Sequence, residues 1–210
     1  MSYNTALFDL DGTLVKTNRV YYITAMNKTF SDLGLGPVPE TLIDEFWDEM
    51  DKASFAQKMF NVSIEAIWET LRKYEDLDFR KSLTTVYGDV GYLNQLREKG
   101  FRLGLVTGAS DRICKIECSM LPVAFDTIVL ARSTYGVDVK PDPKGLYIAL
   151  DNLGSRKENA FYVGNATEDI LAAKAAGMLD IAIDRGDSHP KVVPTKLIKS
   201  LYDLESIILK

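Results

Sequence analysis

The sequence contains a single histidine, His189, in a polar stretch before Pro190. Chemistry that needs a histidine base is therefore not expected, which argues against a Ser-His-Asp hydrolase. The only two cysteines are Cys114 and Cys118, spaced four residues apart as on one face of a helix. Because a zinc site needs further cysteine or histidine ligands nearby, we expect two reduced thiols in a cytoplasmic protein and not a metal clip.

The sequence also lacks an apolar run long enough to span a bilayer. Residues 1–4 are not followed by the basic and apolar segments of a secretory signal, so we expect a cytoplasmic protein. A net charge of −5 over 210 residues argues against nucleic acid or an anionic membrane as partner. A small anionic substrate stays compatible, because a metal and a few local cations can reverse the field in one cleft.

The N-terminal stretch carries the strongest functional pattern. An apolar, strand-like run over residues 5–8 leads directly into Asp9-Leu10-Asp11-Gly12-Thr13. Asp9 and Asp11 point the same way if strand geometry persists, and two like charges so close require a cation or a shared proton. Magnesium suits such a pair because it prefers carboxylate and carbonyl oxygens. Gly12 allows a sharp turn whose amides face an anion; the alternative is an ordinary Asp-Gly turn after a strand.

From about residue 17 to 82 the apolar residues follow helical spacing, in stripes over 22–33, 42–50 and 64–74. Ser63 is suited to cap the last of these helices. This block is predicted to hold about four helices and no strand. The rest of the chain alternates short apolar strands, near 101–107, 127–130, 160–163 and 179–183, with helices, the last of them through Leu197, Leu201, Leu204 and Ile208.

Alternating strands and helices predict an α/β fold, a three-layer Rossmann-like core built on a parallel sheet. The predicted core comprises residues 1–16 and 84–210, and residues 17–83 form an all-helical insertion. In such folds ligands bind at the carboxyl ends of the strands. Polar groups follow several of the predicted strands: Thr107 and Gly108, Lys140, and Asn165 with Glu168 and Asp169.

Each of these groups also has an ordinary explanation. Thr107 would serve as a helix cap, Lys140 as an exposed loop charge, and the acids at 168 and 169 as partners of a helix dipole. Their placement at one edge of the same sheet favours a joint role in phosphoryl transfer. Asp9 would attack phosphorus, and Asp11 would protonate the leaving oxygen and then activate water. Thr107 and Lys140 would bind the phosphoryl oxygens, beside magnesium held by Asp9 and the acidic loop.

The sequence resembles the haloacid dehalogenase-like superfamily of aspartate-nucleophile phosphatases, over nearly its whole length. The resemblance rests on four motifs in order: Asp9-Leu10-Asp11-Gly12-Thr13, Val106-Thr107-Gly108, Lys140-Pro141-Asp142-Pro143, and 163–169 leading to Ala175-Ala176-Gly177. It implies that residues 17–83 form a helical cap that selects the substrate, and that the metal also takes the backbone carbonyl of Asp11. Within the superfamily, Gly12-Thr13 is most similar to the phosphoglycolate phosphatase group.

One position departs from the family pattern, since Asn165 stands where the family's fourth motif usually has aspartate. Asn165 can offer a carbonyl oxygen to magnesium but no charge, so Asp169 is the expected anionic ligand. The expected metal ligands are therefore Asp9, Asp11, Asp169 and Asn165. The expected phosphate-binding residues are Gly12, Thr13, Thr107, Gly108 and Lys140, with Arg19 as a further candidate whose alternative is solvated helix surface.

The sequence thus predicts a magnesium-dependent phosphatase that acts on a small phosphorylated metabolite, as a monomer or homodimer. Two alternatives stay open. A sugar phosphomutase of the same superfamily would isomerise its substrate without net phosphate release. A non-catalytic binding or regulatory protein would have kept the fold and lost turnover through Asn165.

Overall fold

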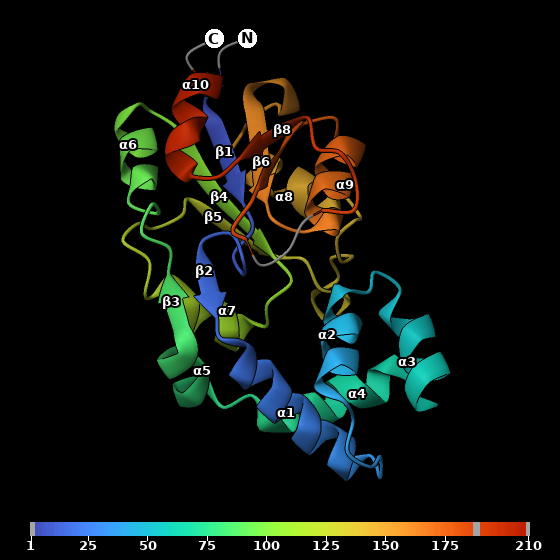
Figure 1. Cartoon of the computed structure of the whole chain (residues 1–210). Helices are drawn as coiled ribbons and strands as arrows, with labels where there is room; N and C mark the ends of the chain where they lie inside the picture. Colours follow the sequence, from blue (N-terminus) through green and yellow to red (C-terminus); the bar gives the residue numbers. More distant parts are fainter. Residues whose placement is uncertain (1–2, 187–189, 209–210) are drawn as a thin grey trace. The chain divides into compact units, whose positions relative to one another are not determined.

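The computed structural model describes residues 3–186 and 190–208, so His189 lies outside the described residues (Figure 1). The chain divides into two compact units, residues 1–16 with 85–210 and residues 17–84. We call the first the core unit and the second the helical unit. Each is described separately below.

The core unit is built on a six-stranded sheet in which every pairing of neighbouring strands is parallel. Its order is β5-β4-β1-β6-β7-β8. The strands are β1 (Thr5–Phe8), β4 (Arg102–Thr107), β5 (Thr127–Leu130), β6 (Ala160–Gly164), β7 (Leu179–Ile183) and β8 (Lys196–Ile198). The chain lays down β4 and β5 on one side of β1 and then returns to add β6, β7 and β8 on the other. The order reverses between β1 and β6, which is where this topology places its ligands.

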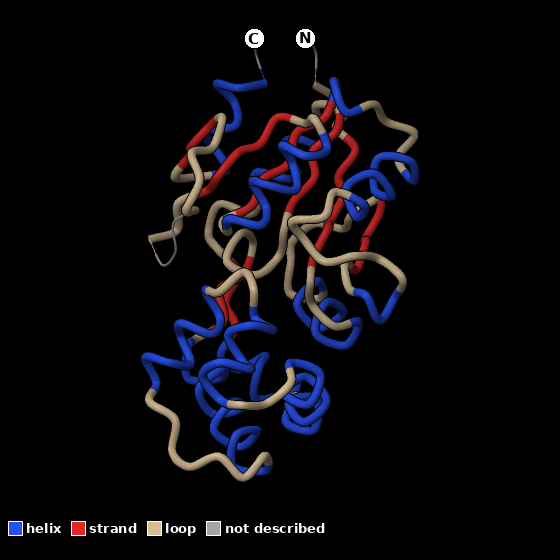
Figure 2. The backbone as a smooth tube through the Cα atoms, turned by 90° about the vertical axis from the view of Figure 1, so that its right-hand side faces the viewer, coloured by secondary structure: helices blue, strands red, loops and turns tan. Residues whose placement is uncertain are grey.

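Helices cover both faces of this sheet, with the strands between them in Figure 2. One face packs against α6 (Tyr92–Glu98), α7 (Asp111–Cys118) and a C-terminal 3₁₀ turn, Leu201–Leu204, that continues into α10 (Glu205–Ile208). The other packs against α8 (Lys144–Asn152) and α9 (Thr167–Ala176). Successive residues of a strand point to opposite faces, so Phe8 packs in the hydrophobic core on one face of the sheet and Leu7 in the core on the other face. The predicted three-layer α/β fold is confirmed.

The helical unit has a hydrophobic core of its own, centred on residues such as Phe30, Phe46 and Ile67. Its helices are α1 (Arg19–Asp32), α2 (Glu40–Asp48), α3 (Lys52–Phe60), α4 (Ile64–Leu71), a 3₁₀ turn (Arg72–Tyr74) and α5 (Leu77–Leu83). Ser63 caps α4 as predicted, since its hydroxyl accepts from the amide of Ala66 at 3.2 Å. The sequence predicted about four helices where the described residues of this unit form five α-helices. The difference arises because α5 spans only seven residues and is too short to show a clear apolar period.

Two short strands were missed, β2 (Val15–Thr17) and β3 (Thr84–Val86), which pair in a separate two-stranded sheet. They carry the two chain crossings between the units. With three residues each, they cannot display the alternation that identifies a strand.

The prediction of a last helix beginning at Leu197 was wrong. Leu197 belongs to β8, where its side chain is 60% exposed while that of Ile198 is buried. Helical structure begins only at Leu201, so Leu197 shared the leucine spacing by coincidence. Cys114 and Cys118 are both free, with their sulfur atoms 3.7 Å apart in α7. Across residues 3–186 and 190–208, no helix has the length and apolarity needed to cross a membrane.

Candidate active site

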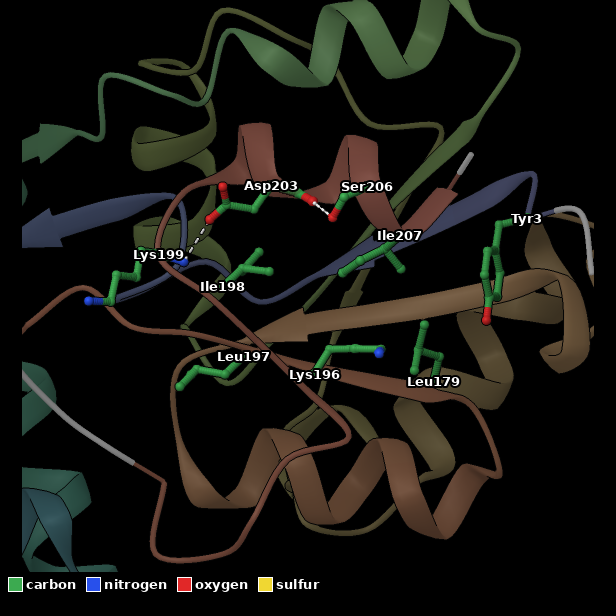
Figure 3. Close-up of a pocket in the computed structure, with 9 residues that line it drawn as sticks. All are labelled: Tyr3, Leu179, Lys196, Leu197, Ile198, Lys199, Asp203, Ser206 and Ile207. Atoms are coloured by element: carbon green, nitrogen blue, oxygen red, sulfur yellow. Dashed lines mark hydrogen bonds between the residues drawn. The ribbon is translucent and has the colours of Figure 1, made fainter. Parts of the chain in front are cut away.

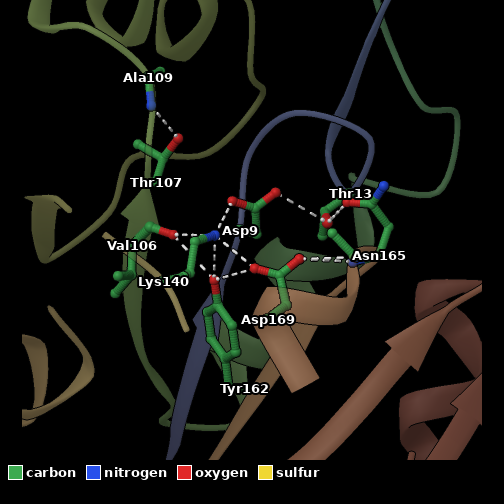
Figure 4. A network of polar contacts seen from close by, with 10 residues as sticks. Asp9, Thr13, Val106, Thr107, Ala109, Lys140, Tyr162, Asn165 and Asp169 are labelled. Atoms are coloured by element: carbon green, nitrogen blue, oxygen red, sulfur yellow. Dashed lines mark hydrogen bonds and ion pairs between the residues drawn. The ribbon is translucent and has the colours of Figure 1, made fainter. Parts of the chain in front are cut away.

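Asp9 follows β1 directly, and its amide continues the pairing by donating to the carbonyl of Val163. Its side chain is only 9% exposed. Oδ1 accepts from Nζ of Lys140 at 2.6 Å, and Oδ2 accepts from Oγ1 of Thr13 at 3.4 Å (Figure 4). The first motif therefore ends in a buried carboxylate with a cation on one oxygen.

Lys140 lies in the connection that leads to α8, but its side chain is only 8% exposed. Its ammonium lies 2.6 Å from Asp9 and 2.6 Å from Oδ1 of Asp169. It also donates to the hydroxyl of Tyr162 at 3.0 Å. The explanation of Lys140 as an exposed loop charge is therefore wrong, and the residue joins the first motif to the fourth.

Asp169 sits in the first turn of α9, yet both of its oxygens are used within the core. Oδ1 accepts from Lys140 and from the hydroxyl of Tyr162, the latter at 3.1 Å. Oδ2 accepts from the backbone amides of Asn165 and Ala166 at 3.1 and 3.0 Å. These amides begin the turn into the helix, so Asp169 fixes the shape of the fourth motif. The cation that the structure places beside Asp169 is the lysine ammonium, and its role as a metal ligand stays a prediction.

Thr13 connects Asp9 to Asn165 across the switch point of the sheet. Its hydroxyl lies 3.4 Å from Oδ2 of Asp9 and 3.2 Å from Oδ1 of Asn165 (Figure 4). Gly12 allows Asn165 to lie this close, because a Cβ at position 12 would lie 2.3 Å from Nδ2 of the Asn165 side chain. The φ of Gly12 is +76°, which also favours glycine. A carboxylate oxygen and an amide oxygen thus lie next to the same hydroxyl.

Thr107 ends β4 and is almost fully buried. Its hydroxyl accepts from the amide of Ala109 at 3.1 Å and so shapes the turn that follows the strand. The alternative role of Thr107 as a helix cap is wrong, because Ser110 caps α7 by accepting from the amide of Ile113. The carbonyl of Gly108 accepts from the Arg132 guanidinium at 3.1 Å.

The electrostatics of the site follow from burial. Burial raises the pKa of Asp9 to about 7; Lys140 opposes this shift, and Asp169 and Asp11 add to it. Burial by itself lowers the pKa of Lys140, but the carboxylates of Asp169 and Asp9 outweigh it and hold that pKa well above its usual value. Three carboxyl groups, those of Asp9, Asp11 and Asp169, lie near a single ammonium, that of Lys140.

Within the described ranges there is no group of three or more His, Cys, Asp or Glu side chains placed to hold a metal. In the fourth motif Asn165 supplies an amide, and the Asp169 carboxylate accepts from Lys140. Two other oxygen atoms, Oδ2 of Asp9 and Oδ1 of Asn165, are hard donors that both lie next to the Thr13 hydroxyl. With more carboxyl groups than ammonium groups nearby, these residues fit a hard divalent cation that keeps several of its own waters.

The contacts of two further predicted residues, Asp11 and Arg19, leave their roles as predictions. Asp11 lies just past Asp9 and forms an isolated bridge with Val15. Arg19 belongs to the helical unit, where its guanidinium donates to Asp44 at 2.7 and 2.6 Å and to Glu40 at 2.8 Å. Its predicted contact with phosphate stays a prediction.

Sequence reasoning missed Tyr162, which it assigned to the core of a strand. Its hydroxyl contacts Lys140, Asp169 and the carbonyl of Val106, the last at 3.1 Å. Burial, with the Asp169 charge adding to it, raises its pKa well above the usual value, so the phenol stays neutral. One signal was available, since a tyrosine in a fully buried strand needs a partner for its hydroxyl.

A pocket of about 720 Å³ lies elsewhere in the core unit, against β8 and α10 (Figure 3). Tyr3, Leu179, Leu197 and Ile207 are among the residues that line it. Asp9, Lys140 and Asp169 are not, so this hollow is separate from the carboxylate cluster.

The fold and this site together define a Rossmann-like α/β protein with a buried aspartate–lysine pair at its switch point. The family model described as haloacid dehalogenase-like hydrolase matches residues 6–183. The chain therefore belongs to the haloacid dehalogenase-like hydrolases.

Curated relatives of the chain include a pyrophosphatase and a phosphoglycolate phosphatase. The chain is 29% identical over 214 residues to the pyrophosphatase PpaX of Halalkalibacterium halodurans, covering 99% of this chain and 98% of the relative. It is 31% identical over 174 residues to a phosphoglycolate phosphatase of Aquifex aeolicus, covering 81% and 80%.

Solved structures agree on the fold. A haloacid dehalogenase-like hydrolase of Streptococcus pneumoniae matches with a TM-score of 0.76 at 20% identity, covering 98% of each chain. An HAD phosphatase of Thermococcus onnurineus matches with a TM-score of 0.68 at 24% identity, covering 98% of this chain and 97% of that one. The family and the class of enzyme predicted from the sequence, a phosphatase of this family, are confirmed.

Proposed function

We propose that this enzyme is a magnesium-dependent phosphatase that hydrolyses a small phosphorylated metabolite through an aspartyl-phosphate intermediate. The observation that carries the proposal is the buried Asp9 carboxylate at the end of β1, held 2.6 Å from Lys140 at the switch point of the sheet. A carboxylate in this position is fixed for attack, and its partner offsets negative charge that would otherwise repel a phosphate.

In the first step a carboxylate oxygen of Asp9 attacks phosphorus, the bond from phosphorus to the leaving oxygen breaks, and Asp11 gives that oxygen a proton. In the second step Asp11 takes a proton from water, which attacks the same phosphorus. Inorganic phosphate leaves and the Asp9 carboxylate is restored. Asp11 thus returns to its starting protonation state after each turnover.

The phosphoryl oxygens would be bound by groups that lie at the carboxyl ends of β1 and β4 and by one lysine. These are the Thr107 hydroxyl, the backbone amides that follow it at Gly108 and at Gly12, the Thr13 hydroxyl and the Lys140 ammonium. Tyr162 supports them by accepting from Lys140 at 3.0 Å, which fixes the direction of the ammonium.

Asp9, Asn165 and the backbone carbonyl of Asp11 would hold the magnesium, with Asp169 as a further candidate ligand. The metal would screen the attacking carboxylate from the phosphate charge. The hard oxygen donors beside Thr13 and the excess of carboxyl groups over ammonium groups support this assignment. Because Asn165 contributes no charge, we expect affinity for the metal to be modest.

The helical unit, residues 17–84, would act as the cap that selects the substrate, with Arg19 as a candidate contact. The named activities of the relatives make pyrophosphate and phosphoglycolate the first compounds to assay. Both are small and carry a second anionic group beside the phosphoryl group that is cleaved.

The test is a screen of phosphorylated metabolites for phosphate release, with the wild type and Asp9→Asn, with magnesium and with a chelator. Release that requires both Asp9 and magnesium supports the proposal. Isomerisation of a sugar phosphate without net release would indicate the phosphomutase alternative. Because Asn165 replaces an acid, a regulatory protein is the second candidate, and turnover that appears only in Asn165→Asp would support it.

A further inference from the structure

A second buried ion pair of the core unit lies outside the four motifs. Arg185 follows β7, and Asp89 lies between β3 and α6. Nη1 and Nη2 of Arg185 donate to the two carboxylate oxygens of Asp89 at 2.8 and 3.0 Å. The two side chains are only 7% and 11% exposed. Such bidentate pairing fixes the orientation of the guanidinium as well as its position.

The rest of the guanidinium is directed at the loop that carries the proposed nucleophile. Nε and Nη2 of Arg185 donate to the backbone carbonyl of Thr13 at 3.2 and 2.7 Å. One arginine therefore joins Asp89 to Thr13, and it stacks on the ring of Tyr87 at 4.0 Å from the centroid. The side chain of the same Thr13 contacts Asp9 and Asn165.

Asp89 is itself fixed by the C-terminal segment of the core unit. Its Oδ2 accepts from the Ser200 hydroxyl at 3.0 Å and from the Leu201 amide at 2.8 Å. Burial by itself raises the pKa of Asp89, but the hydrogen bonds from Arg185 and Leu201 outweigh it and hold the pKa below the usual value. The Asp89 carboxylate is thus charged at neutral pH.

A buried ion pair is a weak device for stability, because desolvation offsets most of the attraction. Here the pair instead supplies donors for one carbonyl of a loop that bonds largely to itself. The amides of Thr13, Leu14 and Val15 all donate to the carbonyl of Leu10, and the amide of Gly12 donates to the carbonyl of Val15. The arginine ties this compact turn to the segment that follows β7, in addition to the bond from the amide of Tyr87 to the carbonyl of Leu14.

We propose that Arg185, held by Asp89, is a positioning residue that fixes the turn over residues 9–15 so that the Thr13 hydroxyl stays on Asp9 and Asn165. Its catalytic consequence rests on the proposed function. Phosphoryl transfer depends on placement of the nucleophile, and a misplacement of about 1 Å can cost on the order of 100-fold in rate.

The kinetic test compares the wild type with Arg185→Met, Arg185→Lys and Asp89→Asn, with an aryl phosphate and saturating magnesium. We expect Arg185→Met to lower kcat by about 10- to 100-fold with KM changed less than about threefold. The kcat of Arg185→Lys should lie between those of the wild type and Arg185→Met. An ammonium is a point charge and cannot donate to Asp89 and Thr13 at once with the planar geometry of a guanidinium. Asp89→Asn should lower kcat in the same way as Arg185→Met and to a smaller extent.

Asp180→Asn is the matched control. Asp180 is a buried acid of β7 whose oxygens accept from the amide and hydroxyl of Thr195 at 2.7 and 2.5 Å. Its loss should lower the melting temperature and leave kcat unchanged. Wild-type kcat in Arg185→Lys and Asp89→Asn, or a loss of kcat in Asp180→Asn that matches Arg185→Met, would show a merely structural role and overturn the proposal.

A second readout does not depend on activity. Amide hydrogen exchange over residues 10–15 should be faster in Arg185→Met by on the order of tenfold, with the amides of β1 and β6 unchanged. Unchanged exchange in this turn would overturn the proposal even if kcat falls. If the wild type releases no phosphate, the proposed function fails while the exchange measurement still decides whether Arg185 fixes the turn. If Arg185→Met does not fold, Arg185→Lys and Asp89→Asn serve in both measurements.

Discussion

The ammonium of Lys140 donates to Oδ1 of Asp9 at 2.6 Å, with both side chains less than a tenth exposed. The residues are 131 positions apart in the chain and meet because one ends a strand and the other enters by a loop at the same edge of the sheet. Lys140 is therefore the residue that opposes the rise in the pKa of Asp9 caused by burial.

Removing that residue should affect stability and turnover together. Lys140→Met leaves Asp9 and Asp169 facing each other without a cation, and breaking a buried pair of this kind costs about 3–5 kcal/mol. We expect the free energy of unfolding to fall by that order in denaturant titrations. Phosphate release should fall by at least about 100-fold, because a phosphate-binding cation is lost as well. Turnover within a few-fold of the wild type in a folded Lys140→Met protein would contradict this role.

The raised pKa of Asp9 gives a pH dependence with a definite sign. Its folded-state pKa of about 7 lies above the ordinary value of 3.8, so between these values the folded protein binds more protons than the unfolded one. The contribution of Asp9 to stability is thus full in acid and is lost as pH rises through about 7. In chelator, the free energy of unfolding of the wild type relative to Asp9→Asn should fall between about pH 4 and pH 7. A difference that does not change with pH would show that Asp9 is not perturbed.

Asn165→Asp should strengthen metal binding. It adds a charged oxygen at the position where Oδ1 of Asn165 now lies 3.2 Å from Thr13. The magnesium concentration for half-maximal activity should fall by about tenfold or more, since affinity follows the charge of the ligands. Asn165→Ala, which removes the oxygen, should raise that concentration. Identical magnesium dependence in all three proteins would exclude Asn165 from the metal site.

Tyr162→Phe tests the hydroxyl that joins Lys140, Asp169 and Val106. Its removal should lower the free energy of unfolding by about 1–3 kcal/mol, because buried partners lose a hydrogen bond. It should also lower kcat a few-fold through a less restrained Lys140. Tyr92→Phe is the matched control, since the buried Tyr92 donates to Glu205 at 2.6 Å away from this site. That variant should lose stability and keep kcat, and an equal loss of kcat in both would remove Tyr162 from the account.

The sequence predicted most of the core sheet, because each strand is a short apolar run whose boundaries glycine or charged residues mark. It also predicted that Asp9, Lys140 and Asn165 lie at one edge of the sheet, since each follows a strand or lies in a strand connection. It could not predict which of them touch. The sequence did not predict strand β8, because three residues with one buried side chain carry no periodic signal.

Contacts that depend on tertiary structure were out of reach in the same way. Lys140 and Tyr162 are 22 residues apart, Arg185 and Asp89 are 96 apart, and Arg185 and Thr13 are 172 apart. No local propensity links such positions. A buried tyrosine or a charged residue just after a buried strand indicates that a partner exists, and only the fold identifies it.

The most direct test of the central claim is whether Asp9 carries the phosphoryl group during turnover. Asp11→Asn should slow hydrolysis of the intermediate, so this variant would be mixed with an aryl phosphate and magnesium, quenched in acid and digested for mass spectrometry. The account predicts that the peptide containing Asp9 gains the mass of a phosphoryl group, and that hydroxylamine removes it. A phosphoryl group on another residue, or full turnover by Asp9→Asn, would contradict the account.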